Sequence, residues 1–433
     1  MKLKIFIGLI VITLSSITIF SQTTTQLPVS SRTRVIQTSP SPTASPSPTP
    51  IRKIVSNNLP SATPLPRPTA TPYNSPVNSS IYPAATPTPQ PTFYKPLSFS
   101  QIKGKIAEAK RQMTARPVST ALTDSFLSTE IIRLAFYDYE AAHLDYIVMT
   151  KTSFLTRNGE ILTTTSNAKP VTVRILRPNG VNTPVMIIDQ QNRAHLPLLV
   201  QYPIERNGAF VETAYYISTH AGVVTPEVVT AGKFYVRNTI DVARENLRKK
   251  GIFISPEVTD TAERLSIVEH VDHQRFWNEN QPNIYNEIYA LFALNEGQTY
   301  RYSVSSAGAG GMVQMIPATY YMIRSRYYNV GLIPDFVEGM RNHANATQAM
   351  LLYMQMTWND LTLNETINNA LESGIATPAE LMSAGYNSNP TKLAGYIRRG
   401  GANWKTLIPR ETKIYLQIYA SMNKYVPVLP RTK

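Results

Sequence analysis

Two hydrophobic patterns divide the chain near residue 237. Between residues 146 and 234, short runs of β-branched and aromatic residues are separated by turn signals such as Asn179-Gly180 and Asn207-Gly208. Beyond residue 238, apolar residues recur at helical spacing. We therefore expect an antiparallel, β-rich region followed by a mainly helical one. The predicted strands lie at residues 145–149, 171–176, 185–188, 196–202 and 214–219.

The helical region contains two predicted helices of particular interest. The first covers residues 240–250 and ends at Gly251, a residue type that commonly caps helix C-termini. The second covers residues 284–295, with its apolar residues on one face, and Glu296 falls at its C-terminal end. Partial burial beside Phe292 and the negative end of the helix dipole would both raise the pKa of the Glu296 carboxyl group. A general acid at neutral pH needs such a shift.

The first 98 residues have a different composition. Residues 22–98 contain 17 of the 33 prolines, and such a segment is expected to be a disordered, extended spacer. Before it, Lys2 and Lys4 precede an apolar run at residues 5–20. This order is typical of a signal peptide, here residues 1–21, and predicts export to the periplasm, the cell wall or the medium. An uncleaved membrane anchor is the alternative.

Composition and charge exclude several classes of function. The 433 residues include no cysteine, which rules out disulfides, thiolate metal sites, a cysteine nucleophile and a cysteine-linked lipid anchor. The net charge of +14 would suggest nucleic acid, but residues 1–98 hold eight basic residues and no acidic one. Removing these eight leaves a net charge of +6 for residues 99–433, which is typical of an ordinary solvated surface. No nucleic-acid partner is therefore predicted. The basic spacer is instead a candidate for attachment to the wall or envelope.

Several motifs come after Glu296 in a fixed order. Ser305 comes nine residues later, and the segments 308–311 (Gly-Ala-Gly-Gly) and 314–319 (Gln-Met-Ile-Pro-Ala-Thr) come next. Farther on lie 384–387 (Ala-Gly-Tyr-Asn) and 408–415 (Ile-Pro-Arg-Glu-Thr-Lys-Ile-Tyr). In this order, within residues 284–420, the motifs resemble the transglycosylase SLT family. These soluble lytic transglycosylases share a lysozyme-like fold with goose-type lysozyme.

The resemblance implies an enzyme that cleaves the β-1,4 bond between N-acetylmuramic acid and N-acetylglucosamine and leaves 1,6-anhydromuramoyl ends. Glu296 would be the general acid and then the base, and neither a cofactor nor a metal is implied. Glycan strands of peptidoglycan would be the partner. Ser305 would be the hydrogen-bond partner of the acid, and Gln314 with the backbone of Gly311 and Met312 would line the sugar groove. Tyr386 and Asn387 would position the acid and the N-acetyl group, and Thr319 and Glu411 are further supporting residues.

The sequence departs from the family pattern in places, and it leaves alternatives open. Gly297 stands where the family usually has Ser, and Val313 stands where it usually has Met. No Asp or Glu occurs from Gly297 to Pro317, so one carboxyl group would act alone. That fits attack by the sugar's own C6 hydroxyl, whereas ordinary glycosidases use two carboxylates. The alternatives are a muramidase, in which water attacks, and a catalytically inactive wall-binding or scaffold protein.

We therefore expect an α+β multidomain protein. Its predicted parts are a signal peptide (1–21), a proline-rich linker (22–98), a β-rich accessory domain (99–238) and a mainly α lysozyme-like domain (239–433). The sequence indicates no partner for the accessory domain. The run Glu269-His270-Val271-Asp272-His273 contains metal-ligating residue types. It lacks the His-Glu-x-x-His order, so no metal site is predicted.

Overall fold

The computed structural model describes residues 90–116, 130–302 and 307–432. By its internal contacts the chain divides into residues 1–82 and Pro83–Lys433, and all described residues belong to the second unit. The predicted signal peptide and most of the predicted linker lie outside the described residues. Within the described ranges, no helix is long and apolar enough to cross a membrane.

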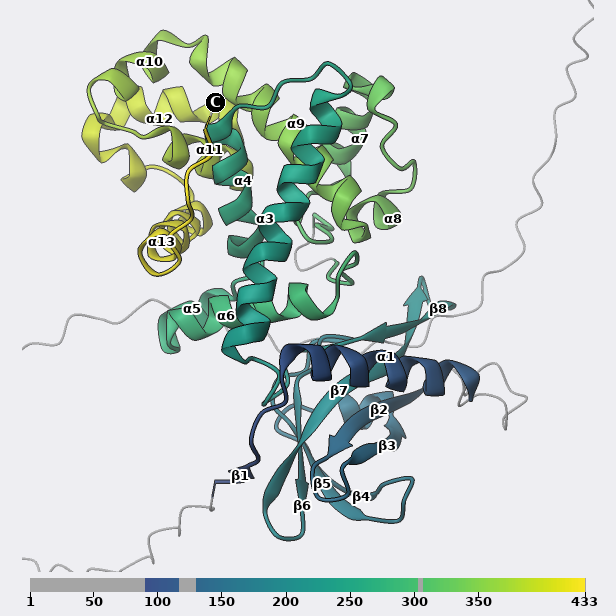
Figure 1. Cartoon of the computed structure of the whole chain (residues 1–433). Coiled ribbons are helices and arrows are strands. Elements are labelled where there is room, and N and C mark those ends of the chain that lie inside the picture. Colours follow the sequence, from purple (N-terminus) through teal and green to yellow (C-terminus); the bar gives the residue numbers. More distant parts are fainter. Residues whose placement is uncertain (1–89, 117–129, 303–306, 433) are drawn as a thin grey trace, which may run out of the picture. The chain divides into compact units, whose positions relative to one another are not determined.

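An eight-stranded, mostly antiparallel sheet precedes most of the helices (Figure 1). Its order is β3-β2-β7-β6-β5-β4, and both β1 and β8 also pair with β7. The five predicted strands are confirmed as β3, β5, β6, β7 and β8, although β8 begins and ends earlier than predicted. The strands are β1 (Thr92–Phe93), β2 (Ile131–Asp138), β3 (His143–Thr150), β4 (Glu160–Thr164), β5 (Pro170–Ile175), β6 (Val185–Asp189), β7 (Arg193–Arg206) and β8 (Ala209–Tyr216).

The β7–β8 hairpin turns where the sequence predicts it. Asn207 has a φ of 54° and Gly208 a φ of 76°. A two-residue turn with positive φ at both positions matches the right-handed twist of the flanking strands, and Asn-Gly adopts it at little steric cost. The strands then pair over seven residue positions, from Arg206 with Ala209 to Val200 with Tyr216.

The central strand β7 is buried on both faces. Val200 and Tyr202 pack into the core that the curled sheet forms with itself. Leu196 and Leu198 pack instead against helix α1 (Phe99–Ala115), whose residue Ile102 is fully buried. Helix α1 is a feature that the sequence analysis missed, because its few apolar residues stand among lysines, glutamines and other polar residues. The last residues of the predicted linker also belong to the fold, since β1 pairs with β7.

Helices form most of the chain after residue 225. Helix α3 begins at Pro226, earlier than the predicted residue 240, with Thr225 as its N-cap, and it therefore crosses the predicted domain boundary at residue 238. The helices are α2 (Lys151–Phe154), α3 (Pro226–Arg248), α4 (Pro256–Val268), α5 (His273–Asn278), α6 (Gln281–Leu294), α7 (Pro317–Arg326), α8 (Phe336–Arg341), α9 (His343–Thr362), α10 (Glu365–Glu372), α11 (Pro378–Asn387), α12 (Leu393–Gly400) and α13 (Arg410–Tyr425). Short 3-10 helices cover Tyr328–Val330, Pro390–Lys392 and Gly401–Thr406.

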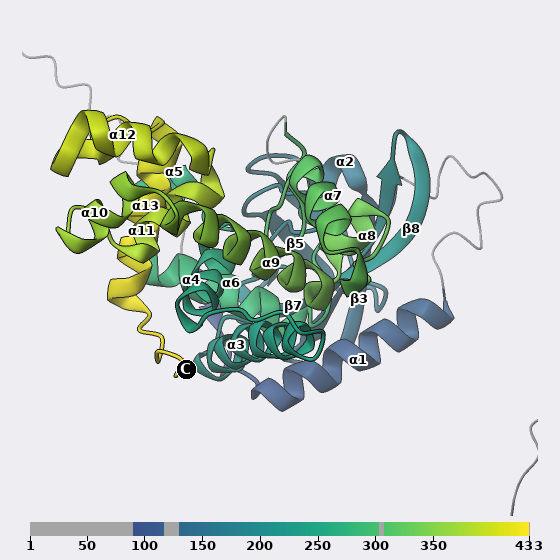
Figure 2. The same cartoon turned by 90° about the horizontal axis from the view of Figure 1, so that it is seen from above.

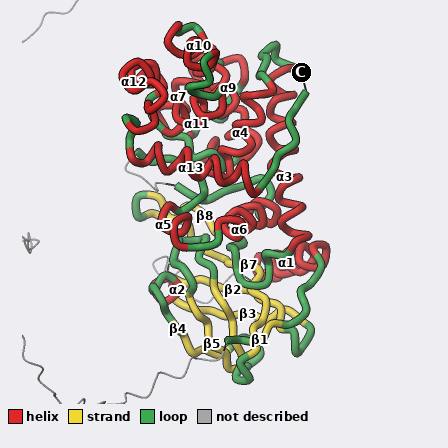
Figure 3. The backbone as a smooth tube through the Cα atoms, turned by 90° about the vertical axis from the view of Figure 1, so that its left-hand side faces the viewer, coloured by secondary structure: helices red, strands yellow, loops and turns green. Residues whose placement is uncertain are grey.

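Helix α6 joins the sheet to the helices. Its residues Ile284 and Phe292 pack into the main helical core, while Ala290 and Leu294 pack into the core shared with α1 and β7. The sheet and the helices are therefore connected by continuous packing, and α6 lies between them (Figure 3). A smaller core around the buried Trp404 holds α10 to α12 together on the side away from α1 (Figure 2).

Candidate functional site

Glu296, the predicted acid, comes directly after the C-terminal end of α6. The side chain of the preceding residue, Asn295, donates to the Ile217 carbonyl at 2.7 Å and accepts from the Ile217 N–H at 2.9 Å. These two bonds fix the end of α6 to the chain just after β8. Both Glu296 oxygens lie 3.1 Å from Lys103 Nζ on α1. The Glu296 side chain is 48% exposed. The expected burial beside Phe292 is therefore wrong, because Phe292 turns into the core while Glu296 faces solvent.

The backbone after Glu296 is held by two neighbouring helices. The Tyr235 hydroxyl of α3 accepts the Gly297 N–H at 2.6 Å and hydrogen-bonds His343 Nδ1 at 2.8 Å. His343 Nε2 in turn lies 2.7 Å from Thr299 Oγ1. Burial lowers the pKa of His343 to about 3, so its ring is neutral. These contacts fix the chain at Gly297 and Thr299.

The turn at residues 310–314 is too tight for most side chains. Gly311 has a φ of 71°, its N–H donates to the Arg301 carbonyl at 2.8 Å, and a Cβ there would stand 1.8 Å from the Met340 carbonyl oxygen. The Gln314 amide donates to the carbonyls of Gly311 at 2.8 Å and Arg301 at 3.1 Å. Met312 is fully buried. The Gln314 side chain thus holds the turn together, and the Met312 side chain packs into the helical core. That Gln314 and the backbone of Gly311 and Met312 line a sugar groove stays a prediction.

The two C-terminal motifs meet beside this turn. Tyr386, near the end of α11, donates its hydroxyl to the Val313 carbonyl at 2.7 Å. Asn387 Oδ1 accepts from the Thr412 hydroxyl of α13 at 2.8 Å. The segments 311–314, 384–387 and 408–415 are thus brought together. Tyr386 acts here on the backbone of the turn.

A second glutamate, Glu269, lies among these motifs. It directly follows Val268, the last residue of α4, and is partly buried at the C-terminal end of that helix. The Tyr415 hydroxyl donates to Glu269 Oε1 at 2.7 Å. Burial raises the pKa of Glu269 to about 7; the charge of Glu411 acts in the same direction, and Tyr415 and Arg301 oppose it. Near neutral pH, both the protonated and the ionised form of Glu269 are therefore well populated.

The end of α4 is bonded directly to the turn. Arg301 Nη1 donates to the Glu269 carbonyl at 2.6 Å, and Arg301 itself accepts from Gly311 through its backbone. His270 Nε2 lies 2.9 Å from the Met312 carbonyl oxygen. Since a carbonyl only accepts, and burial lowers the pKa of His270 to about 3, a neutral His270 donates this bond. The Glu269 carboxyl group therefore has rigid surroundings.

Sequence reasoning considered Glu269 only as part of the metal-like run 269–273. In the described part of the chain, no three His, Cys, Asp or Glu side chains gather in a way that could hold a metal ion. The local signal for Glu269 is weak: an apolar helical run that ends in a carboxylate. Its decisive partner, Tyr415, lies 146 residues away in the chain. No pattern of local spacing could have linked the two.

The remaining predicted site residues are Ser305, Thr319 and Glu411. Ser305 lies outside the described residues. Thr319 is half-buried in the first turn of α7. Glu411 is exposed in the first turn of α13.

Comparison of the chain with protein-family models, with curated proteins and with solved structures gave no significant match.

Proposed function

We propose that the protein cleaves the glycan strands of peptidoglycan as a lytic transglycosylase. The observation that carries this proposal is the Glu269 carboxyl group, partly buried at the end of α4, bonded by Tyr415 and with a pKa of about 7. Such a group can donate a proton near neutral pH and take one back. The resemblance of residues 305–319, 384–387 and 408–415 to the transglycosylase SLT family supports the substrate class.

We assign the acid role to Glu269, although the motif spacing points to Glu296. Glu296 is solvated, and both of its oxygens are engaged by Lys103. Glu269 instead has the burial and the helix-end position that raise the pKa of a carboxyl group toward neutral pH. It also lies among the turn and the two C-terminal motifs.

The proposed reaction needs one carboxyl group. Glu269 gives its proton to the glycosidic oxygen as the bond from that oxygen to C1 of the muramoyl sugar breaks. The C6 hydroxyl of the same sugar then attacks C1, and its proton passes to the Glu269 carboxylate. One C–O bond breaks, one forms, no water is consumed and Glu269 is restored. The Tyr415 hydroxyl orients the carboxyl group throughout.

Export is part of the same proposal, because peptidoglycan lies outside the cytoplasm. We base it on the charged and apolar order of residues 1–21 and on the basic, proline-rich character of residues 22–98. The spacer would hold the enzyme near the wall or envelope.

The test is mass spectrometry of muropeptides released from purified peptidoglycan by the wild-type protein, by Glu269→Gln and by Glu296→Gln. Glutamine keeps the size of glutamate and can still accept from Tyr415, but it cannot donate a carboxyl proton. We expect 1,6-anhydromuramoyl products from the wild type and from Glu296→Gln, and none from Glu269→Gln.

Other outcomes have separate meanings. Products that persist in Glu269→Gln and vanish in Glu296→Gln would move the acid role to Glu296. Products with reducing ends would indicate that water attacks, and the protein would then be a muramidase. If the wild type sediments with the wall but releases nothing, it belongs to the wall-binding or scaffold class.

A further inference from the structure

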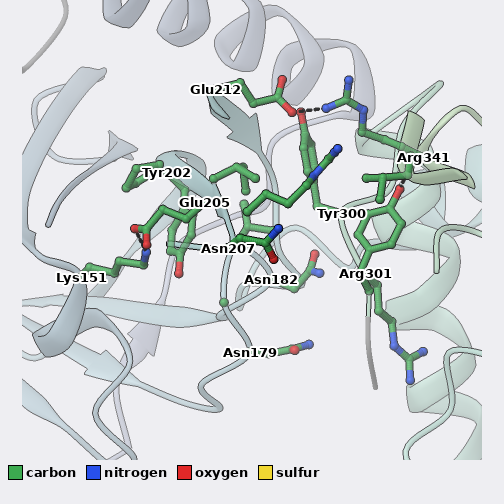
Figure 4. Close-up of a pocket in the computed structure, with 17 residues that line it drawn as sticks. Lys151, Asn179, Asn182, Tyr202, Glu205, Asn207, Glu212, Tyr300, Arg301 and Arg341 are labelled. Carbon is green, nitrogen blue, oxygen red and sulfur yellow. Dashed lines mark hydrogen bonds and ion pairs between the residues drawn. The ribbon is translucent and has the colours of Figure 1, made fainter. Parts of the chain in front are cut away.

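A hollow of about 270 Å³ lies between the connection from β5 to β6 and the helices α5 and α6. It adjoins a larger cleft of about 570 Å³ beside the β7–β8 hairpin, since Asn179, Asn182 and Arg301 line both spaces. Figure 4 shows the side chain of Arg301 directed away from the Glu212–Arg341 ion pair of the larger cleft. The volume of the hollow is near the lower limit of ligand pockets, so the hollow suits a small ligand.

The charged lining of the hollow is positive overall. It consists of three arginines and two carboxylates, namely Arg177, Arg275, Arg301, Asp272 and Glu287. Three positive charges against two negative ones leave a net charge of +1. His270 also lines the hollow, but burial lowers its pKa to about 3, so its ring adds no charge near neutral pH.

One of the three arginines has its charge fully matched. The guanidinium group of Arg275 donates to the Glu287 carboxylate at 2.8 and 2.9 Å and to the Glu279 carboxylate at 2.7 and 2.8 Å. Asp272 makes no ion pair among the described residues; it caps α5 by accepting the Arg275 N–H at 2.9 Å. Glu287 is therefore used by Arg275, and Asp272 by the backbone of its own helix.

The other two arginines are poorly matched. Arg177 meets the Glu287 carboxylate through a single contact of 3.4 Å. Arg301 has no ion-pair partner in the described part of the chain, and its side chain donates there only to the Glu269 carbonyl, at 2.6 Å. Burial lowers the pKa of both guanidinium groups. Nearby carboxylates therefore compensate these two positive charges only in part.

The hydroxyl groups around the hollow are largely engaged. Ser218 Oγ donates to the Asn182 carbonyl at 2.6 Å, and Thr299 Oγ1 lies 2.7 Å from His343 Nε2. The two poorly matched guanidinium groups are therefore the strongest donors that remain. A guanidinium group presents a planar fork of N–H donors, which matches the oxygens of a carboxylate or a phosphate.

We infer that this hollow binds a small oxyanion, a carboxylate or a phosphate group, through the guanidinium groups of Arg177 and Arg301. The inference rests on the charges and hydrogen bonds of the lining residues and is independent of the proposed function. It assigns a ligand to the poorly matched arginines beside the candidate acid.

The site is coupled to Glu269 through Arg301. His270 follows Glu269 directly in the chain, and Arg301 donates to the Glu269 carbonyl. Burial raises the pKa of Glu269, and the charge of Arg301 opposes this rise. A bound anion would offset the charge of Arg301, so it would raise the pKa of Glu269 further.

The test is calorimetric titration of the full chain at low ionic strength, with inorganic phosphate in one arm and malonate in the other. Arg177→Gln removes one guanidinium group, whereas Asp272→Asn removes a negative charge from the lining and still caps α5. The control is Arg157→Gln, which changes an exposed arginine outside the hollow that has no ion pair among the described residues.

We expect Arg177→Gln to weaken binding of the anion about ten-fold, the effect of losing a hydrogen bond to a charged group. Asp272→Asn should bind about three-fold more tightly, because a repelling charge is removed. Such a gain cannot come from a damaged fold. The control should bind as the wild type does.

Absence of saturable binding of both anions by the wild type would overturn the inference. Unchanged affinity in both Arg177→Gln and Asp272→Asn would overturn it too, as would an equal loss in Arg177→Gln and Arg157→Gln. Tighter binding of phosphate would identify the ligand group as a phosphate, and tighter binding of malonate would identify it as a carboxylate. The readout involves no turnover, so absence of anhydromuramoyl products counts against the proposed function alone.

Discussion

The replacement Glu269→Gln should change how stability depends on pH. In the folded protein the pKa of Glu269 is about 7, against 4.5 for the ordinary group. Between these two values the folded state binds more protons than the unfolded state, so the free energy of unfolding falls as pH rises. The stabilising contribution of the protonated form is complete below about pH 4.5 and is lost as pH passes 7. Glutamine does not titrate and lacks this slope.

The size of the effect can be worked out from the shift. At about 1.4 kcal/mol per pKa unit, a rise from 4.5 to about 7 corresponds to about 3 kcal/mol. Solvent screens part of this contribution, because Glu269 is only partly buried. We therefore expect a change of about 2 to 3 kcal/mol in the free energy of unfolding. Relative to the wild type, Glu269→Gln should gain that amount of stability between pH 4.5 and pH 8.

The assay is urea denaturation of both proteins at several pH values, followed by tyrosine and tryptophan fluorescence. The quantity to compare is the difference between the two free energies of unfolding at each pH, which removes the contribution of every other titrating group. A difference that stays constant from pH 4.5 to pH 8 would refute the reasoning, because Glu269 would then have no raised pKa. The control is Gln190→Ala, which changes an exposed side chain that does not titrate. Its free energy of unfolding should differ from that of the wild type by the same amount at every pH.

Two further changes test the surroundings of Glu269. Tyr415→Phe removes the hydroxyl that stabilises the ionised carboxylate, so the alkaline limb of the activity profile should move to higher pH; an unmoved limb would contradict a role for this bond. Gly311→Ala places a Cβ 1.8 Å from the Met340 carbonyl at a φ of 71°, and should cost about 2 to 4 kcal/mol in denaturant unfolding. A loss below about 0.5 kcal/mol would mean that the turn relaxes easily.

Much of the fold could be predicted because its signals are local. Alternating β-type runs predicted the strands β5 to β7 close to their observed bounds, and the Asn207-Gly208 turn was predicted correctly, whereas β8 was predicted too late in the chain. Helix α1 was missed because its buried residues, such as Ile102 and Met113, are few and gain meaning only from the face of β7 beneath them. The start of α3 was placed too late, although the Thr225-Pro226 cap is a recognisable signal.

The candidate site was likewise predictable from the sequence only in part. The sequence alone determined the motif segments, their order and the family that they resemble, because these depend on residue identity and spacing. Tertiary structure alone decided the surroundings of the two glutamates: Glu296 meets Lys103 from 193 residues away, and Glu269 meets Tyr415 from 146 residues away. The physical reason is that the pKa of a carboxyl group depends on burial and nearby charges, and these come from segments that only folding brings together.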